Sequence, residues 1–400
     1  MKLLNISHRI PHPLKDGGAI MIYNFLKGYK NLGIETHFIG IAAKKHQINL
    51  TQARAKLEKL AKVYFFKLDT DVKIWGAFTH LINRKSYNIT RFYHPELARY
   101  IKDKLDQEEF DAIQFETIFM APYLPIVRSM TKAPCILRQH NMESEIWERR
   151  AKSEKNKIKK AYLLHLTKRL RQFEKKNIPL FDSIAWVTEN DREKGKVCSG
   201  QSRNYVVPTG IEIPKKTINA KINSNKWYHL GALDWPANID SLQWFLKNIW
   251  PTLVQKNKEI ELHIAGRNCP VFLKKMKLDK VYIHGEVEDK ETFLKDKSIC
   301  LIPIKAGSGI RIKLLEAVAQ GKVIVSTRIG CQGIPEELLK TTIVANDLGE
   351  FLLAQKEIEK IETKTIEQMR GKLKKRYSIE NTALHMAKII FPNQAFTSKK

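Results

Sequence analysis

Buried strands alternate with amphipathic helices along this chain, and that alternation limits its possible folds more than any other feature. Residues 2–7 have the pattern of a buried strand, Asp16 and two glycines open a helix, and residues 34–42 form a second strand pattern. Parallel strands need a long crossover, so this spacing predicts a βαβ unit. Further strand patterns extend it into a parallel sheet, at 110–116, 133–140 and 182–189.

The same alternation returns in the second half of the chain. It follows a polar, aperiodic stretch at 211–226 that contains Pro214 and is typical of an interdomain linker. Strand patterns occur at 227–233, 259–266, 280–285, 298–304 and 322–327, with helices expected at about 238–256 and 311–320 and through the last fifty residues. The sequence therefore predicts an α/β protein of two Rossmann-like parallel-sheet domains, with a ligand in the cleft between them.

The charge of the chain indicates a negatively charged partner. Its 400 residues carry a formal charge of +28, from 70 Lys and Arg against 42 Asp and Glu. Nucleic acid, an anionic bilayer and a phosphorylated ligand would all fit such a charge. The excess is spread over both halves and no nucleic-acid-binding module is evident, so nucleic acid is the least favoured of the three.

Cysteine usage and hydropathy indicate a cytoplasmic protein. The five cysteines are scattered and contain no CxxC pair, which argues against a disulfide framework or a zinc site. The N-terminus has no long apolar run, so we expect no signal peptide. Nor does any stretch of about 18 apolar residues occur that would span a membrane.

The segment 149–176 is the main irregularity in the charge pattern. It contains twelve basic residues and two acidic ones. Apolar side chains recur within it at helical spacing: Ile158, Tyr162, Leu166, Leu170 and Phe173. A basic amphipathic helix of this kind can lie on an anionic membrane surface. A solvated helix face is the other interpretation, and the sequence leaves both open.

Two glycine turns at helix starts are candidate phosphate-binding sites. Gly17 and Gly18 follow the first strand; this signal is weak, because a plain helix start has the same appearance. The segment 305–327 is stronger, because it reads as strand, glycine-rich turn, helix, glycine and strand. Neither GxGxxG nor a Walker pattern occurs in the chain.

The second turn combines free backbone N–H groups with two cations. Gly307, Ser308 and Gly309 would present N–H groups at the start of a helix. Arg311 and Lys313 fall in its first turn, where a cation is unfavourable beside the helix dipole unless an anion is bound. A diphosphate would fit there. Glu316, one turn further, could accept hydrogen bonds from sugar or ribose hydroxyls.

These residues resemble the retaining, nucleotide-sugar-dependent glycosyltransferases of family 4, which have the GT-B fold. The resemblance covers nearly the whole chain and is most specific at 307–327. Its other elements are the glycines after the first strand, RQHNMES (138–144), VVPTGI (206–211), 231–251 and HIAGRN (263–268).

The resemblance implies two domains and the direction of transfer. Residues 1–208 would form the acceptor-side domain, and residues 209–377 the nucleotide-sugar-binding domain. The C-terminal helix, about 378–400, would pack back on the first domain. A sugar would pass from a UDP- or GDP-sugar, with retention and without a metal or other cofactor, to a glycan or lipid-linked acceptor. The product would be a bacterial surface polysaccharide, such as lipopolysaccharide, capsule or exopolysaccharide, made in the cytoplasm or at the inner face of the membrane.

The resemblance also implies roles for individual residues. His140 would contact the transferred sugar, and Arg311 and Lys313 would neutralise the leaving diphosphate. Glu316 would bind the ribose. The remaining donor-binding residues would be Gly17, Gly18, Gly307, Ser308, Gly309, Ile310 and Leu314.

Three departures from the family pattern affect the donor site. Ser308 replaces the first glutamate of the family's Glu-seven-residues-Glu motif, and Thr209 replaces a frequent asparagine. The basic residues that are frequent after the first strand of the second domain are absent from 231–240, where Arg311 and Lys313 could take over their charge. A catalytically silent nucleotide-sugar-binding paralogue is therefore the alternative to an active transferase.

Three further features have ordinary explanations. Asp69-Thr70-Asp71 forms a DxD triplet that could hold a metal in a different transferase fold, but it lies outside the predicted glycine turns. His140 without the resemblance would be a core histidine at a strand end. Tryptophans occur near the second domain's first helix, and core packing is the favoured interpretation of these: Trp235, Trp244 and Trp250.

Overall fold

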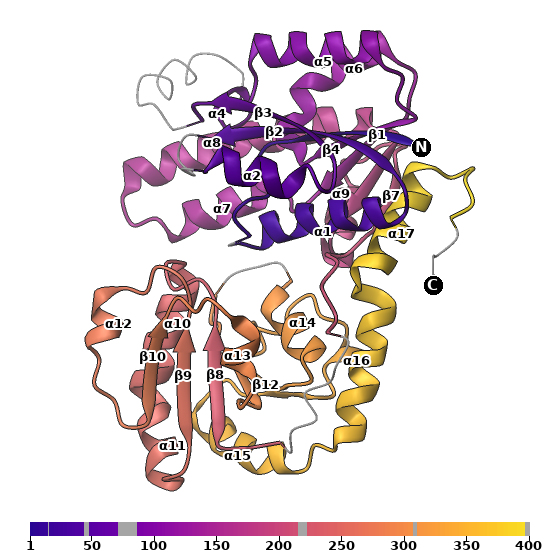
Figure 1. Ribbon diagram of the computed structural model, residues 1–400. Coiled ribbons are helices and arrows are strands. Elements are labelled where there is room, and N and C mark those ends of the chain that lie inside the picture. Colours follow the sequence, from indigo (N-terminus) through magenta and orange to yellow (C-terminus); the bar gives the residue numbers. More distant parts are fainter. Residues whose placement is uncertain (15, 44–47, 71–85, 215–221, 307–309, 397–400) are drawn as a thin grey trace. The chain divides into compact units, whose positions relative to one another are not determined.

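The computed structural model divides the chain into two compact units (Figure 1). It describes all residues except 15, 44–47, 71–85, 215–221, 307–309 and 397–400. The first unit contains Met1–Gly210 together with Thr382–Lys400, and the second contains Ile211–Asn381. Residues 215–221 of the predicted linker and the three residues of the second glycine turn therefore lie outside the described residues.

The first unit is built on a seven-stranded sheet whose paired strands are all parallel. The order β3-β2-β1-β4-β5-β6-β7 places β1 beside both β2 and β4, as the βαβ reading predicts. Its strands are β1 Lys2–Ser7, β2 Glu35–Ala43, β3 Lys62–Leu68, β4 Ala112–Glu116, β5 Cys135–Gln139, β6 Ser183–Trp186 and β7 Arg203–Val206.

Helices of the first unit begin and end where local chemistry dictates. Asp16 caps α1, because its side chain accepts a hydrogen bond from the N–H of Ala19, and Gly33 follows the helix at φ +73°. The helices are α1 Gly17–Asn31, α2 Leu50–Leu57, α4 Tyr87–Thr90, α5 Pro95–Gln107, α6 Leu124–Met130, α7 Glu143–Ser153, α8 Lys157–Asn177 and α9 Glu189–Lys196.

The predicted basic helix at 149–176 is interrupted. It is divided between α7 and α8, with Glu154–Asn156 between them and Asn156 capping α8. Leu166 and Leu170 are buried as their spacing predicts, but Ile158 is 84% exposed because it lies in the first turn of α8, beyond the protein core.

The second unit repeats the architecture with six parallel strands, in the order β10-β9-β8-β11-β12-β13. This confirms an α/β fold with two parallel-sheet domains. Its strands are β8 Lys226–Leu230, β9 Glu261–Ala265, β10 Val281–Gly285, β11 Ile299–Ile302, β12 Val323–Ser326 and β13 Thr342–Val344.

The helix expected at 238–256 is in fact two helices. The first ends at Asn248 and the second begins at Trp250, because Pro251 lacks an N–H and cannot continue the ladder of the preceding helix. The helices of the second unit are α10 Pro236–Asn248, α11 Trp250–Lys256, α12 Val271–Lys275, α13 Lys290–Leu294, α14 Ile312–Ala319, α15 Leu348–Glu359 and α16 Thr363–Tyr377.

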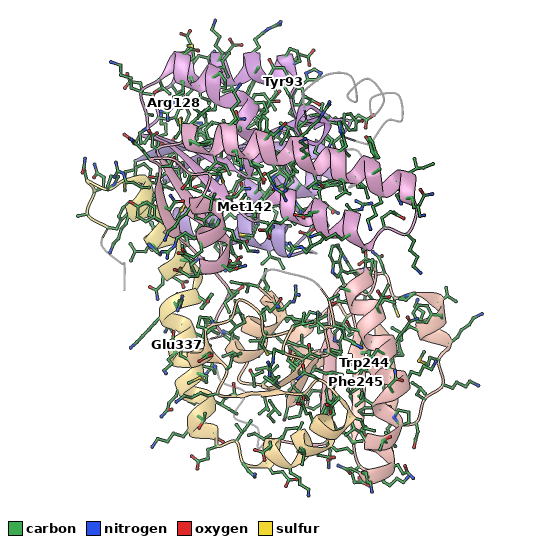
Figure 2. The ribbon with its side chains drawn as sticks, turned by 180° about the vertical axis from the view of Figure 1, so that it is seen from behind. Tyr93, Arg128, Met142, Trp244, Phe245 and Glu337 are labelled. Atoms are coloured by element: carbon green, nitrogen blue, oxygen red, sulfur yellow. The ribbon has the colours of Figure 1, made fainter. Side chains whose placement is uncertain are left out.

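The three tryptophans near α10 have different environments. Trp250 is buried in the core, and Trp244 packs against that core beside Phe245 (Figure 2). Trp235 is 63% exposed, so the core interpretation was wrong for this residue, which precedes the helix rather than lying on its inner face.

The C-terminal residues are helical, as expected. Helix α17, Ile379–Ile390, follows α16, and the division between the two units falls within it. No helix among the described residues combines the length and apolar character needed to cross a membrane.

We expect Gly195→Ala to destabilise the first unit. A Cβ atom at this helical glycine in α9 would lie 2.1 Å from the buried ring of Trp186, so the ring or the helix must shift. Overpacking of this kind costs about 1–3 kcal/mol. In the matched substitution Gly371→Ala in α16, the new Cβ meets no atom within 4 Å. This variant should raise the free energy of unfolding of the second unit by roughly 0.5–1 kcal/mol. Denaturant unfolding of each variant against the original chain tests both signs.

Candidate functional site

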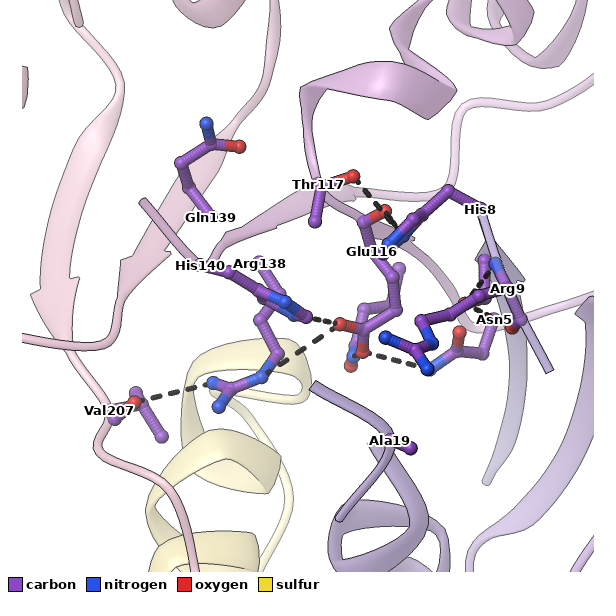
Figure 3. Close-up of polar contacts among 12 residues, drawn as sticks. Asn5, His8, Arg9, Ala19, Glu116, Thr117, Arg138, Gln139, His140 and Val207 are labelled. Carbon is purple, nitrogen blue, oxygen red and sulfur yellow. Dashed lines mark hydrogen bonds and ion pairs between the residues drawn. The ribbon is translucent and has the colours of Figure 1, made fainter. Parts of the chain in front are cut away.

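Charged side chains of the first unit gather at the carboxyl ends of its three central strands. His8 and Arg9 follow β1, Glu116 is the last residue of β4, and Arg138 and His140 belong to or follow β5 (Figure 3). Because parallel strands end at one edge of the sheet, residues more than a hundred positions apart in sequence meet there. We call these five residues the first-unit cluster.

Glu116 is the acceptor at the centre of the first-unit cluster. Its side chain is fully buried, and its carboxylate accepts a hydrogen bond of 2.7 Å from His140 Nε2. Gln114 Nε2 and Asn5 Nδ2 donate to the other carboxylate oxygen, at 2.5 and 3.4 Å. Burial alone would raise the pKa of Glu116, but the hydrogen bond from His140 and the charge of Arg138 hold it below its usual value.

His140 is held in one tautomer by this contact. Burial lowers the pKa of His140, and Glu116 opposes that shift without cancelling it. The imidazole is therefore neutral near pH 7. Since an ionised carboxylate can only accept, Nε2 must carry the proton and Nδ1 the lone pair. The geometry thus orients a neutral imidazole at the end of β5.

Arg138 places a buried positive charge below Glu116. Its Nε lies 4.0 Å from Glu116 Oε2, its Nη1 donates to the Val207 carbonyl at 3.3 Å, and its guanidinium lies 3.9 Å from the centre of the Phe25 ring. Arg138 is 0% exposed, and its Nε and Nη2 have no hydrogen-bond partner within the described part of the chain. A buried cation of this kind depends on its carboxylate neighbour.

The start of α1 adds a second ion pair to this edge. Arg9 forms a bidentate pair with Asp16, with distances of 2.9 and 2.8 Å, and Asp16 also caps the helix. A Cβ atom on Gly18 would lie 3.2 Å from Arg9 Nη1, so this glycine leaves room for the pair. Gly17 and Gly18 are partly exposed at the open end of the helix, where N–H groups lack intrahelical partners.

The predicted residues of the second unit lie around the start of α14. Arg311 is the N-cap residue, and Ile310 packs against the core below it. Leu314 has its side chain fully buried in that core, so only its backbone could contact a ligand. The three predicted residues Gly307, Ser308 and Gly309 lie outside the described residues.

Lys313 and Glu316 line one hollow of the second unit. This hollow is small, with a cavity volume of about 20 Å³, and its lining also includes Lys290, Tyr228 and Cys300. Glu316 Oε2 accepts a hydrogen bond of 2.8 Å from Lys290 Nζ. Lys313 Nζ donates to Asn238 Oδ1 at 3.0 Å, and burial lowers the pKa of Lys313 to about 8. The hollow thus brings two lysines and one carboxylate together.

The sequence did not identify the partners of the predicted residues. Glu116, Lys290 and Asn238 each contact one of them, but each comes from a distant part of the chain. Only Glu116 carried a signal, because it is an acidic residue that closes an otherwise buried strand pattern. Lys290 and Asn238 had no signal of their own.

One group of possible metal ligands occurs among the described residues, at the other edge of the first sheet. Glu35, His37 and Glu108 bring three ligand atoms within 4.8 Å of one another. Both carboxylates are already paired with lysines, namely Lys62 on Glu35, and Lys2 and Lys104 on Glu108. These lysines give the group a net positive charge that opposes a metal cation. In the DxD triplet, Asp71 lies outside the described residues.

The architecture places this chain in a known structural class. It has the GT-B fold, with two parallel-sheet α/β domains, and matches solved glycosyltransferase structures along nearly its full length. S. aureus TarM, solved with fondaparinux, alpha-GlcNAc-glycerol and UDP, gives a TM-score of 0.64 at 13% identity, covering 98% of this chain and 100% of that one. The lipopolysaccharide outer core galactosyltransferase WaaB gives 0.61 at 12% identity, with the same coverage.

Sequence comparison adds a family match within the second unit. Residues 224–367 match the model of the family described as glycosyl transferases group 1. A curated relative, an uncharacterized 44.6 kDa protein in the cps region of Klebsiella pneumoniae, is 21% identical over 357 residues, which cover 86% of this chain and 88% of that protein.

We expect Glu116→Gln to destabilise the first unit and lower the pKa of His140. The amide keeps the size of the side chain but removes the charge that offsets Arg138. Breaking a fully buried ion pair on one side costs about 3–5 kcal/mol. The exposed Glu96→Gln should change stability by less than about 0.5 kcal/mol. Denaturant unfolding measures the change in stability, and an NMR titration of the His140 imidazole measures the change in its pKa. An unchanged titration would contradict the assigned pairing.

Proposed function

We propose that this chain is a retaining glycosyltransferase that moves a sugar from a UDP- or GDP-sugar to a glycan or lipid-linked acceptor. The proposed pathway is bacterial surface polysaccharide synthesis, at the cytoplasmic face of the membrane. Support for the pathway comes from relatives whose names mention a cps region and a lipopolysaccharide outer core.

The hollow along α14, which Lys313 and Glu316 line, is the observation that carries the proposal. It lies within the region that matches the glycosyl transferases group 1 family. Its lysines suit a diphosphate, and the carboxylate of Glu316 suits the hydroxyls of a ribose. The helix start adds the favourable end of a backbone dipole.

In the proposed reaction the bond between the sugar's anomeric carbon and the diphosphate breaks. The acceptor hydroxyl then bonds to that carbon from the same face, and its proton passes to the departing phosphate. Arg311 and Lys313 would neutralise the negative charge that develops on the diphosphate, so no metal is needed for this step. The neutral imidazole of His140, oriented by Glu116, would hydrogen-bond a hydroxyl of the transferred sugar.

We expect one UDP- or GDP-sugar to bind and be turned over at the same rate with and without EDTA. Lys313→Ala should reduce kcat/KM by about 100-fold, because it removes a cation from the developing charge. Calorimetry gives the binding, and release of nucleotide diphosphate gives the turnover. The exposed Lys356→Ala on α15 is the matched control and should leave both unchanged.

A donor-binding protein without transferase activity is the second candidate. It is favoured by Ser308, which occupies a position where the family that this sequence resembles has a glutamate. Such a protein would bind the donor but neither transfer nor hydrolyse the sugar with any acceptor tested. If none of the UDP- and GDP-sugars tested binds, both candidates are contradicted.

We also propose that the tip formed by α7 and α8 contacts an anionic membrane surface. Ile158 projects there at 84% exposure, between Lys157 and Lys159. Lys155 and Lys157 are exposed and Lys160 is partly exposed, and in the described part of the chain none of these three pairs with a carboxylate. Unpaired cations around an exposed apolar side chain suit an anionic lipid interface.

We expect the chain to sediment with phosphatidylglycerol vesicles and not with phosphatidylcholine vesicles. Replacing Lys155, Lys157 and Lys160 by alanine should weaken this binding by about 100-fold, at about 1 kcal/mol for each lysine. The same replacement of Lys247, Lys256 and Lys258, which are exposed on the second unit, is the control. Equal losses in the two triple variants would contradict a contact localised at the α7–α8 tip.

A further inference from the structure

Lys313 is held in position by a residue outside its own helix. It lies in the first turn of α14, yet its ammonium reaches the end of β8, where a Cβ atom on Gly231 would lie only 2.9 Å from Nζ. The acceptor that meets it is Asn238 Oδ1, at 3.0 Å, in the first turn of α10.

The amide of Asn238 is itself fixed. Asn238 is 6% exposed, and its Nδ2 donates to the carbonyl of Ala232 at 2.8 Å. Because a carbonyl oxygen can only accept, this contact settles which end of the amide is the nitrogen and turns Oδ1 toward Lys313. The amide therefore bridges the loop after β8 and the ammonium, and a rotated amide would present N–H groups to a cation.

We propose that Asn238 is a positioning residue for Lys313, holding its ammonium at the carboxyl end of β8 for the diphosphate of a nucleotide donor. This inference rests on the proposed function of the hollow and deepens it. An uncharged acceptor suits the task, because it orients the cation without neutralising it. A carboxylate in this position would compete with the diphosphate for the same ammonium.

The charged and titratable groups facing Lys313 come from four elements. They are Tyr228 and His229 on β8, Cys300 on β11, Arg311 and Glu316 on or next to α14, and Lys290 on α13. His229 Nδ1 contacts the Leu301 carbonyl and burial lowers the pKa of His229 far below its usual value, so this imidazole adds no charge. Among the described residues, Asn238 is the hydrogen-bond acceptor of the Lys313 ammonium.

The pH dependence follows from the position of Lys313. Burial lowers the pKa of Lys313 to about 8, so the ammonium is charged below that pH and neutral above it. We therefore expect the affinity for UDP or GDP to fall as the pH rises through about 8. Asn238→Asp should raise the pKa of Lys313 and move this fall to higher pH. Asn238→Ala should lower the pKa and move the fall to lower pH.

Calorimetry with UDP, GDP and the corresponding nucleosides between pH 6.5 and 9.5 tests the inference. At pH 7, Asn238→Ala should bind the diphosphate about tenfold more weakly, because a hydrogen bond that orients a charged group is lost. Its affinity for the nucleoside, which has no phosphate, should not change. Asn248→Ala is the matched control, because Asn248 is an exposed asparagine on the same helix whose Nδ2 contacts the Trp244 carbonyl.

Gly231→Ala provides a second variant that leaves Asn238 itself unchanged, since the new Cβ would lie 3.5 Å from Asn238 Nδ2, an ordinary contact distance. The new methyl group would displace the end of the Lys313 side chain, which is flexible, so the fold should persist. Binding of the diphosphate should weaken while binding of the nucleoside remains. If both ligands weaken equally in the Asn238 variants, Asn238 has only a structural role and the inference is overturned.

Failure of the proposed function would look different. An original chain that binds neither UDP nor GDP would contradict the nucleotide site itself and would remove the inferred role with it. The pairing of Asn238 with Lys313 can be measured without any nucleotide, by an NMR titration of the lysine ε-carbons. A Lys313 pKa that is the same in Asn238→Asp, Asn238→Ala and the original chain would overturn the inference alone.

Discussion

Every strand of a parallel sheet delivers its last residue to the same edge, and the sites of this molecule depend on that constraint. In the first unit it brings together side chains that follow β1, β4 and β5, and in the second it brings the start of α14 to the end of β8. The hydrophobic clusters occupy the two faces of each sheet. Polar and charged groups that cannot enter those faces therefore concentrate at the strand ends.

The two units treat buried charge in different ways. In the first, Glu116 is surrounded by donors, and the buried charge of Arg138 helps to keep it ionised. That arrangement suits the orientation of an imidazole. In the second, Lys313 is held by a neutral amide instead of a carboxylate, and burial works against its charge. A buried ammonium without a carboxylate partner is stabilised strongly when an anion binds beside it, as in an anion-binding site.

Sequence patterns predicted the elements better than the contacts between them. Buried strands have a strong local signature, so most strands of both sheets were predicted, although β3 and β13 were not. A helix was predicted at about 311–320 and is found at Ile312–Ala319. Pro251 is a local signal for the end of α10, but the apolar periodicity continues past it, and a single helix was therefore predicted at 238–256. The exposure of Ile158 depends on where the core ends, which no local pattern records. The pairing of Glu116 with His140 joins two strands, and the pairing of Asn238 with Lys313 joins two helices 75 residues apart. Spacing along the chain contains no information on such distances.

The position of Lys313 shows why a missing motif is not the same as a missing charge. Residues 231–240 contain no basic side chain, whereas basic residues are frequent here in the family that the sequence resembles. The ammonium of Lys313 lies beside Gly231 nevertheless, because a lysine side chain is long enough to reach the end of β8 from the first turn of α14. Gly231 leaves the space, and Asn238 supplies the acceptor. A diphosphate would interact with the position of the charge, whichever segment of the chain supplies it. The departure at 231–240 is therefore compatible with nucleotide binding, and the departure at Ser308 is the one that bears on catalysis.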